Sequence, residues 1–288
     1  MTEPLGCRGA RPGARTLSAR APVRHGPRSP VRSSAATPTV LRGPPTEEPT
    51  DDLLEERGEL VAEAHDRLGH ELGWQLLLSP ARTLDEATRL ALVGLNPGGD
   101  HALPPQLSTE AGNAYRVEGW APDGTPNRLQ QQVTTLFELL AARLGEGASA
   151  AELMDGTLTT SFCPFRSPDW QRLAARDESV EVARELWDEL LTHVWPSVFV
   201  CLGELAATEI GAALQRAGAL RSGTSTAPVH WGKATYTETL YRADRGDVLV
   251  VRLPSLTRFS IFGREASQDV VDVLVEDIAA TLERADAA

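Results

Sequence analysis

LALVGLNPGGD, residues 90–100, is the stretch of this sequence that decides the fold. Its apolar half, Leu90 to Val93, runs directly into Gly, Asn and Pro, which is typical of a buried strand that ends in a sharp loop. In open α/β sheets, ligands bind at the carboxyl ends of the strands. A loop there that carries an amide and a carboxylate is a candidate site, although a plain strand-to-helix turn explains the same residues.

Strand and helix patterns alternate along the rest of the chain. Strands are predicted at 89–95, 157–163, 197–202, 234–241 and 247–253. Helices are predicted from residue 51 on, after Asn127 as N-cap, at 178–194, at 204–217 and over a closing segment. Their expected apolar faces are Leu60, Ala64, Leu68 and Leu72 in the first helix, Leu129, Val133, Leu136, Phe137 and Leu140 in the second, and Val270, Val271, Leu274, Ile278 and Leu282 in the last.

This alternation favours parallel pairing with helices on both faces of the sheet. We therefore expect an α/β fold, a three-layer α/β/α sandwich around a central, mostly parallel four-stranded sheet. The loop from Asn96 to about Pro126 is long for a compact domain, and such loops are usually functional or disordered.

Charge divides the chain into two parts. Residues 1–46 carry eight Arg and one acidic residue, which gives them a formal charge of +7. Because the whole chain carries −12, residues 47–288 carry −19. The same residues contain eight Pro and no periodic apolar pattern, which predicts a disordered tail over 1–50 and one α/β domain over 51–288. A basic tail can hold nucleic acid electrostatically, and an unselected extension explains it equally well. The acidic body argues against a general polyanion binder.

Several classes of protein are disfavoured by the sequence. No apolar run approaches the roughly 18 residues needed to span a membrane, and the N-terminus lacks the apolar core of a secretory signal. The three cysteines are scattered, which fits reduced thiols in the cytoplasm and gives no metal-ligand spacing. Nucleotide-binding glycine fingerprints and the G-x-S-x-G nucleophile elbow are missing from the sequence. We expect a cytoplasmic protein without cofactor or metal.

Three predicted strands end in a proline with polar neighbours. These loops are Asn96-Pro97-Gly98, Cys163-Pro164-Phe165-Arg166 and Leu253-Pro254-Ser255. Loops after parallel strands lie on one edge of the sheet, and proline stiffens each of them. Rigid loops on one rim are what a preorganised site needs.

Here the chain resembles the uracil-DNA glycosylase superfamily. Residues 94–98, Gly-Leu-Asn-Pro-Gly, are similar to the Gly-Ile-Asn-Pro-Gly motif of its mismatch-specific uracil/thymine branch. Residues 253–258, Leu-Pro-Ser-Leu-Thr-Arg, resemble the His-Pro-Ser or Asn-Pro-Ser motif of the family. Residues 163–168 and 201–206 lie where family members have similar runs. The resemblance covers about 85–265 and implies the glycosylase fold.

The resemblance implies an enzyme that flips a base out of DNA and hydrolyses its N-glycosidic bond. Asn96 would position the attacking water, and Asp100 would supply charge or act as base, unless it only caps a turn. The base pocket would include Gly94, Leu95, Pro97, Gly98, Gly99, Tyr115, Ser161, Phe162 and Leu253. Tyr115, Trp120 and Phe162 are the candidates for stacking on the base, with a core position favoured for Phe162. DNA would be held by Arg166, Ser255, Leu256, Thr257 and Arg258, with Leu256 as a wedge or as plain packing.

Two positions depart from the family pattern. Leu253 stands where many relatives have a hydrogen-bonding His or Asn, and Ser161 stands where some have a base-reading Asn. Because hydrogen-bond readers give strong discrimination, their loss indicates a pocket altered for another ligand. A modified pyrimidine, such as those that some viruses carry in their DNA, is one hypothesis, and it would give the enzyme a role in phage defence.

Three functions are therefore open. The first is a metal-independent DNA glycosylase that acts as a monomer on duplex or single-stranded DNA. The second is a catalytically silent DNA-binding module of the same fold, and the third is a hydrolase of free nucleosides or small glycosides. None of the three involves a membrane.

Overall fold

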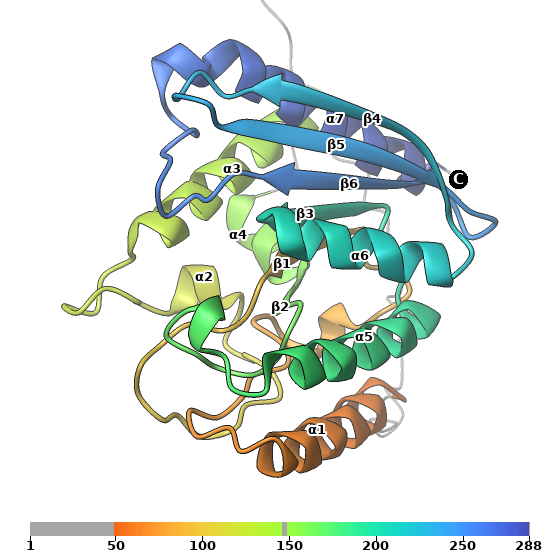
Figure 1. The fold of residues 1–288 in the computed structure, drawn as a ribbon. Coiled ribbons are helices and arrows are strands. Elements are labelled where there is room, and N and C mark those ends of the chain that lie inside the picture. The colour runs from red at the N-terminus through yellow and green to blue at the C-terminus, as the bar shows by residue number, and fades with distance from the viewer. Residues whose placement is uncertain (1–48, 146–148, 288) are drawn as a thin grey trace, which may run out of the picture. The chain divides into compact units, whose positions relative to one another are not determined.

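The computed structural model describes residues 49–145 and 149–287, which centre on a six-stranded sheet of order β2-β1-β3-β6-β5-β4 (Figure 1). The strands are β1 (Leu90–Gly94), β2 (Leu158–Ser161), β3 (Val198–Leu202), β4 (Leu220–Pro228), β5 (Thr235–Arg242) and β6 (Val248–Leu253). β2, β1, β3 and β6 run parallel to one another. β5 and β4 extend the sheet antiparallel from β6.

The predicted α/β class is confirmed, but the four-stranded, mostly parallel sheet is wrong. The four parallel strands form only one part of a mixed sheet of six. β4 was missed because Leu220–Pro228 contains no apolar alternation, and almost all its residues are exposed. β4 pairs with β5 alone, so it forms an edge of the sheet that needs no apolar face.

Helices cover both faces of the sheet. They are α1 (Pro49–Arg67), α2 (Ala114–Val117), α3 (Arg128–Leu144), α4 (Ala150–Asp155), α5 (Arg176–His193), α6 (Glu204–Arg216) and α7 (Gln268–Asp286). Successive residues of β1 point to opposite faces: Ala91 and Val93 join the core beneath α1, α5 and α6, whereas Leu90 and Leu92 join the core with α3 and α7. All five residues of β1 are buried, as expected for a central parallel strand.

The helix ends test two predictions. Asn127 caps α3 as predicted, because its side chain accepts from Gln130 N at 3.0 Å and Gln130 Oε1 accepts from Asn127 N at 3.0 Å. The apolar face predicted for the first helix is confirmed at Ala64 and wrong at the other three positions. Leu60 is 49% exposed, Leu68 and Leu72 follow the end of α1, and the helix instead buries Leu53, Leu54, Val61 and Ala64.

The predicted tail lies outside the described residues, apart from residues 49 and 50, which begin α1. The described residues all belong to one compact unit. Among them, no helix has the length and apolar character to cross a membrane.

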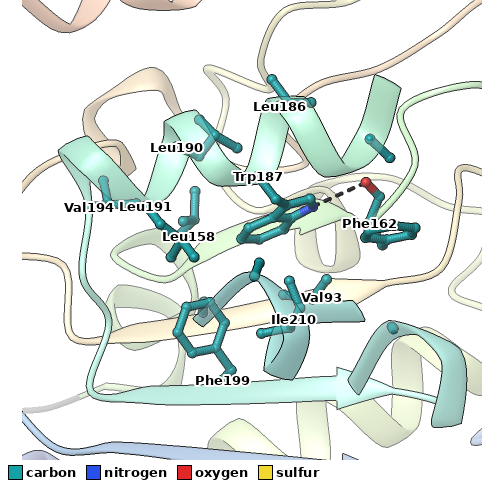
Figure 2. Close-up of a cluster of buried hydrophobic side chains, with 14 of the residues drawn as sticks. Val93, Leu158, Phe162, Leu186, Trp187, Leu190, Leu191, Val194, Phe199 and Ile210 are labelled. Atoms are coloured by element: carbon teal, nitrogen blue, oxygen red, sulfur yellow. Dashed lines mark hydrogen bonds between the residues drawn. The ribbon is translucent and has the colours of Figure 1, made fainter. Parts of the chain in front are cut away.

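Trp187 of α5 connects the core to the loop that follows β2 (Figure 2). Its indole is fully buried and meets the Phe199 ring edge-on, with centroids 6.2 Å apart. Its Nε1 donates a hydrogen bond of 3.1 Å to the carbonyl of Phe162. Phe162 is the first residue after β2, so the start of this loop is fixed from the core side.

Candidate active site at the carboxyl edge of the sheet

The parallel strands end level with one another. Gly94 of β1 pairs with Ser161 of β2, and Leu202 of β3 pairs with Leu253 of β6. The loops after β1, β2 and β6 therefore leave the same edge of the sheet, as predicted from the parallel pairing of their strands. Because neighbouring strands lie about 4.8 Å apart, the loop after β6 starts roughly 10 Å from the loop after β1.

The loops after β1 and β2 are joined through their backbones. Phe162 N donates to Gly94 O at 2.8 Å, and Cys163 N donates to Leu95 O at 2.9 Å. These bonds continue the parallel ladder beyond the ends of both strands. The two loops therefore form one rigid unit, which is the preorganisation that a catalytic site requires.

Asn96 is held by the loop after β2. Its Nδ2 donates to Ser167 Oγ at 2.8 Å, to Pro97 O at 3.1 Å and to Phe165 O at 3.4 Å. Carbonyl oxygens only accept hydrogen bonds, so these partners fix which end of the amide is the nitrogen. The Ser167 hydroxyl in turn donates to the Asp169 carbonyl at 2.8 Å. Asn96 Oδ1 has no partner within the described residues and remains an oriented acceptor on a half-buried side chain.

The hydroxyls of two buried residues lie close to Gly94. A Cβ placed on this glycine would lie 3.4 Å from Ser161 Oγ and 3.9 Å from Tyr115 OH. Both side chains are only 4% exposed, and no hydrogen bond of either hydroxyl occurs within the described residues. Burial raises the pKa of Tyr115 well above its usual range, so the phenol stays a neutral donor. Neither oxygen is among the fully buried polar atoms that lack a partner, so both hydroxyls keep access to solvent and form a polar floor beside Gly94.

The segment that carries Tyr115 is anchored by a buried glutamine. Gln130 of α3 is fully buried; its Nε2 donates to Glu118 O at 2.7 Å and to Tyr115 O at 3.3 Å, and its Oε1 accepts from Trp120 N at 3.0 Å. The Tyr115 and Trp120 rings meet edge to face at 4.7 Å. Gln130 was missed by the sequence reasoning, although its place three residues after Asn127 is the capping-box spacing that could have drawn attention to it.

Arg166 acts as a brace between loops. The half-buried guanidinium donates to Gln75 Oε1 at 2.7 Å and to Gly98 O at 3.2 Å. Burial lowers its pKa, while the nearby Glu118 carboxylate acts in the opposite direction. Arg166 was expected to hold DNA, and these contacts direct Nη1 and Nη2 of its guanidinium toward neighbouring segments of the protein.

Four other expected site residues are either largely exposed or buried in the cores. The Asp100 side chain is 72% exposed and contacts His101 Nδ1 at 3.0 Å, and no contact joins it to Asn96 within the described residues. Phe162, Leu253 and Leu256 are at most 2% exposed and belong to the two cores. Phe162 therefore packs in the core, the position that the sequence favoured over base stacking, and the expected wedge at Leu256 is corrected to core packing, because neither side chain has a free surface.

The remaining expected residues divide into floor and rim. Leu95 and Pro97 are part of the loop that Arg166 braces, and Gly98 and Gly99 are exposed at its tip. Gly99 has a φ of 124°, a backbone conformation that residues with a side chain rarely adopt. Ser255, Thr257 and Arg258 are exposed on the loop after β6. Ser255 Oγ and Thr257 Oγ1 lie 2.8 Å apart, and Arg258 N donates to Ser255 O at 3.0 Å.

No protein-family model matches this chain, and a search of curated proteins likewise finds no match. The resemblance to the uracil-DNA glycosylases therefore stays a prediction that rests on the motifs and on the geometry above. Among residues 49–145 and 149–287, no group of three or more His, Cys, Asp and Glu side chains is arranged to hold a metal ion.

Proposed function

We propose that this protein is a DNA glycosylase that excises a flipped, damaged, mismatched or modified base and leaves an abasic site. The observation that carries the proposal is the fixed amide of Asn96, whose nitrogen is held by three acceptors while its oxygen is left to bind water. An amide used only as a turn cap would not need acceptors from a second loop.

The proposed reaction is a hydrolysis. A water oxygen forms a bond to C1′ of the nucleotide, and the C1′–N bond breaks with its electron pair going to the base. The water proton passes to the departing base or to solvent. Asn96 Oδ1 accepts one hydrogen of this water and aligns its lone pair with C1′, which removes much of the entropic cost of the attack.

The floor beside Gly94 supports recognition of the base. Ser161 and Tyr115 offer two neutral hydroxyl donors, which would stabilise the negative charge that develops on the oxygens of a departing pyrimidine. The missing side chain at Gly94 lets the base approach the backbone. Leu253 supplies no hydrogen bond, so we place the preference with a modified pyrimidine, and an antiviral role follows as a hypothesis.

The rim supports contact with DNA. Ser255, Thr257 and Arg258 are exposed on the same edge as Asn96, where hydroxyls and a guanidinium can bind phosphates. Since Leu256 is buried, the gap left by the flipped base would be filled by another side chain, and Arg258 is the exposed candidate on that loop.

The proposal is tested with a panel of DNA substrates. Duplexes and single strands that carry uracil, a G·T mismatch or modified cytosines are incubated with the protein and then treated with alkali, which cleaves abasic sites. We expect strand cleavage on at least one modified pyrimidine and slow or no cleavage on plain uracil. If none of the substrates is cleaved, the proposed activity is wrong.

A silent DNA-binding module is the second candidate. It is favoured by the outward position of Asp100 and by the burial of Leu253 and Leu256, which removes three of the expected functional side chains from the site. This candidate predicts salt-sensitive DNA binding without release of any base, and the same panel distinguishes the two functions.

A further inference from the structure

A cavity lies at the edge of the sheet where the parallel strands begin, opposite to the edge that carries Asn96. Its lining comes from the residues just before β1, β3 and β6, from the end of β5 and from the C-terminal part of α7. The volume is about 670 Å³. This size falls within the roughly 300–1,000 Å³ that is usual for small-molecule sites.

Positive charge gathers around this cavity. Four guanidinium groups line it, from Arg89, Arg242, Arg245 and Arg284. Two carboxylates oppose them: Asp247 lines the cavity, and Asp286 Oδ1 lies 3.9 Å from Arg89 Nε. These arginines come from three segments of the chain: Arg89 precedes β1, Arg242 and Arg245 belong to the end of β5 and the turn after it, and Arg284 belongs to α7. The body of the protein carries a formal charge of −19, so a cluster of this sign runs against the overall balance.

The arginines have hydrogen-bond donors to spare. Arg242 donates through Nε to Ser222 Oγ at 3.3 Å, and Arg284 donates through Nη2 to Thr281 Oγ1 at 2.9 Å. Arg245 donates through Nη1 to a backbone carbonyl of α5. Each guanidinium has five N–H groups, so most of their donors have no partner within the described residues.

The floor of the cavity is preformed. Trp195 is 8% exposed, and its Nε1 donates to Gly246 O at 3.3 Å. The Arg245 guanidinium lies over the same indole, 4.8 Å from the ring centroid. Ser197 Oγ donates to the carbonyl of Arg89 at 3.1 Å. A floor fixed in this way costs little to organise when a ligand binds.

We propose that this cavity, which we term the basal arginine cavity, binds a small phosphorylated anion. Guanidinium groups match phosphate oxygens in pairs, and four cations against the carboxylates of Asp247 and Asp286 favour a ligand with two negative charges. The volume suits a ligand that carries a diphosphate group and is no larger than a nucleotide. The site lies away from Asn96 and does not depend on the proposed glycosylase function.

The experiment is a calorimetric titration of the full chain with pyrophosphate at constant ionic strength. We expect saturable binding that weakens at least tenfold in the double variant Arg242→Gln/Arg284→Gln. Arg67→Gln is the matched control, because Arg67 is an exposed arginine of α1 that does not line the cavity. Absence of pyrophosphate binding by the wild type, or equal weakening in the control, overturns the proposal.

Two further arms make the result specific. Pyrophosphate should raise the melting temperature of the wild type and leave that of the double variant unchanged, which also shows that the variant folds. ADP should compete with pyrophosphate. If short DNA binds at this cavity while pyrophosphate and ADP do not, the ligand is a nucleic acid and the proposal fails.

Discussion

His70 gives this protein a predicted loss of stability in mild acid. Its side chain is 7% exposed, its ring stacks on Phe165 at 4.1 Å between centroids, and its Nε2 lies 3.0 Å from Ser179 Oγ. Burial lowers the pKa of His70 from 6.5 to about 4, and the neighbouring His65 adds to the effect. The folded chain therefore keeps this imidazole neutral in a pH range in which the unfolded chain protonates it.

The sign and size of the effect follow from proton linkage. Above pH 6.5 both states are neutral at this residue, and His70 makes no pH-dependent contribution. As the pH falls from 6.5 to about 4, the unfolded state binds a proton that the folded state does not, so the free energy of unfolding decreases. The difference between the two pKa values corresponds to about 3 kcal/mol when complete, and to about 2 kcal/mol at pH 5.

The assay is urea unfolding at pH 7 and pH 5, followed by tryptophan fluorescence, for the wild type and His70→Phe. Phenylalanine keeps the stack on Phe165 and has no group that binds a proton. Between pH 7 and pH 5, the free energy of unfolding of the variant should therefore fall by about 2 kcal/mol less than that of the wild type. His101, whose side chain is 85% exposed, offers His101→Gln as the control with wild-type pH dependence. An unchanged pH dependence in His70→Phe would refute the reasoning.

Three further predictions concern the candidate site. Ser167→Ala removes the 2.8 Å acceptor of Asn96 and should slow base release about tenfold under single-turnover conditions with little change in DNA affinity, whereas an equal loss of affinity would contradict this role. Gln130→Leu removes a buried group with several partners and should lower the free energy of unfolding by about 2–4 kcal/mol in urea, against less than about 0.5 kcal/mol for the exposed neighbour Gln131→Ala. Gly94→Ala places a methyl group 3.4 Å from a pocket hydroxyl and should impair base release while leaving the melting temperature close to that of the wild type.

The central strands and the shared edge of the loops could be predicted from the sequence because they depend on local signals. β1 is a short apolar run closed by breakers, and Asn127 precedes a 3.6-residue apolar period, so both are encoded within a few residues. β4 could not be found this way. It is exposed and held only by β5, so its pairing is visible only in the assembled sheet.

The details of the site depend on contacts that are distant in the sequence. The hydrogen bond between Asn96 and Ser167 joins residues that are 71 positions apart, and the sequence around either residue does not predict it. Leu256 is an apolar side chain of the kind that can wedge between bases. In the folded chain it points instead into the core that its loop covers. Tyr115 was a candidate for stacking on a base, and the structure instead directs its hydroxyl toward Gly94.

The measurement that tests the central claim most directly compares the wild type with Asn96→Ala on the best substrate of the panel. Release of the free base is followed by chromatography under single-turnover conditions, and affinity for the same DNA is followed by fluorescence anisotropy. The account predicts that the variant binds within about twofold of the wild type and releases the base at least a hundredfold more slowly, as expected when the residue that orients the water is lost. Equal rates of base release by the two proteins would contradict the assignment of Asn96 and the mechanism built on it.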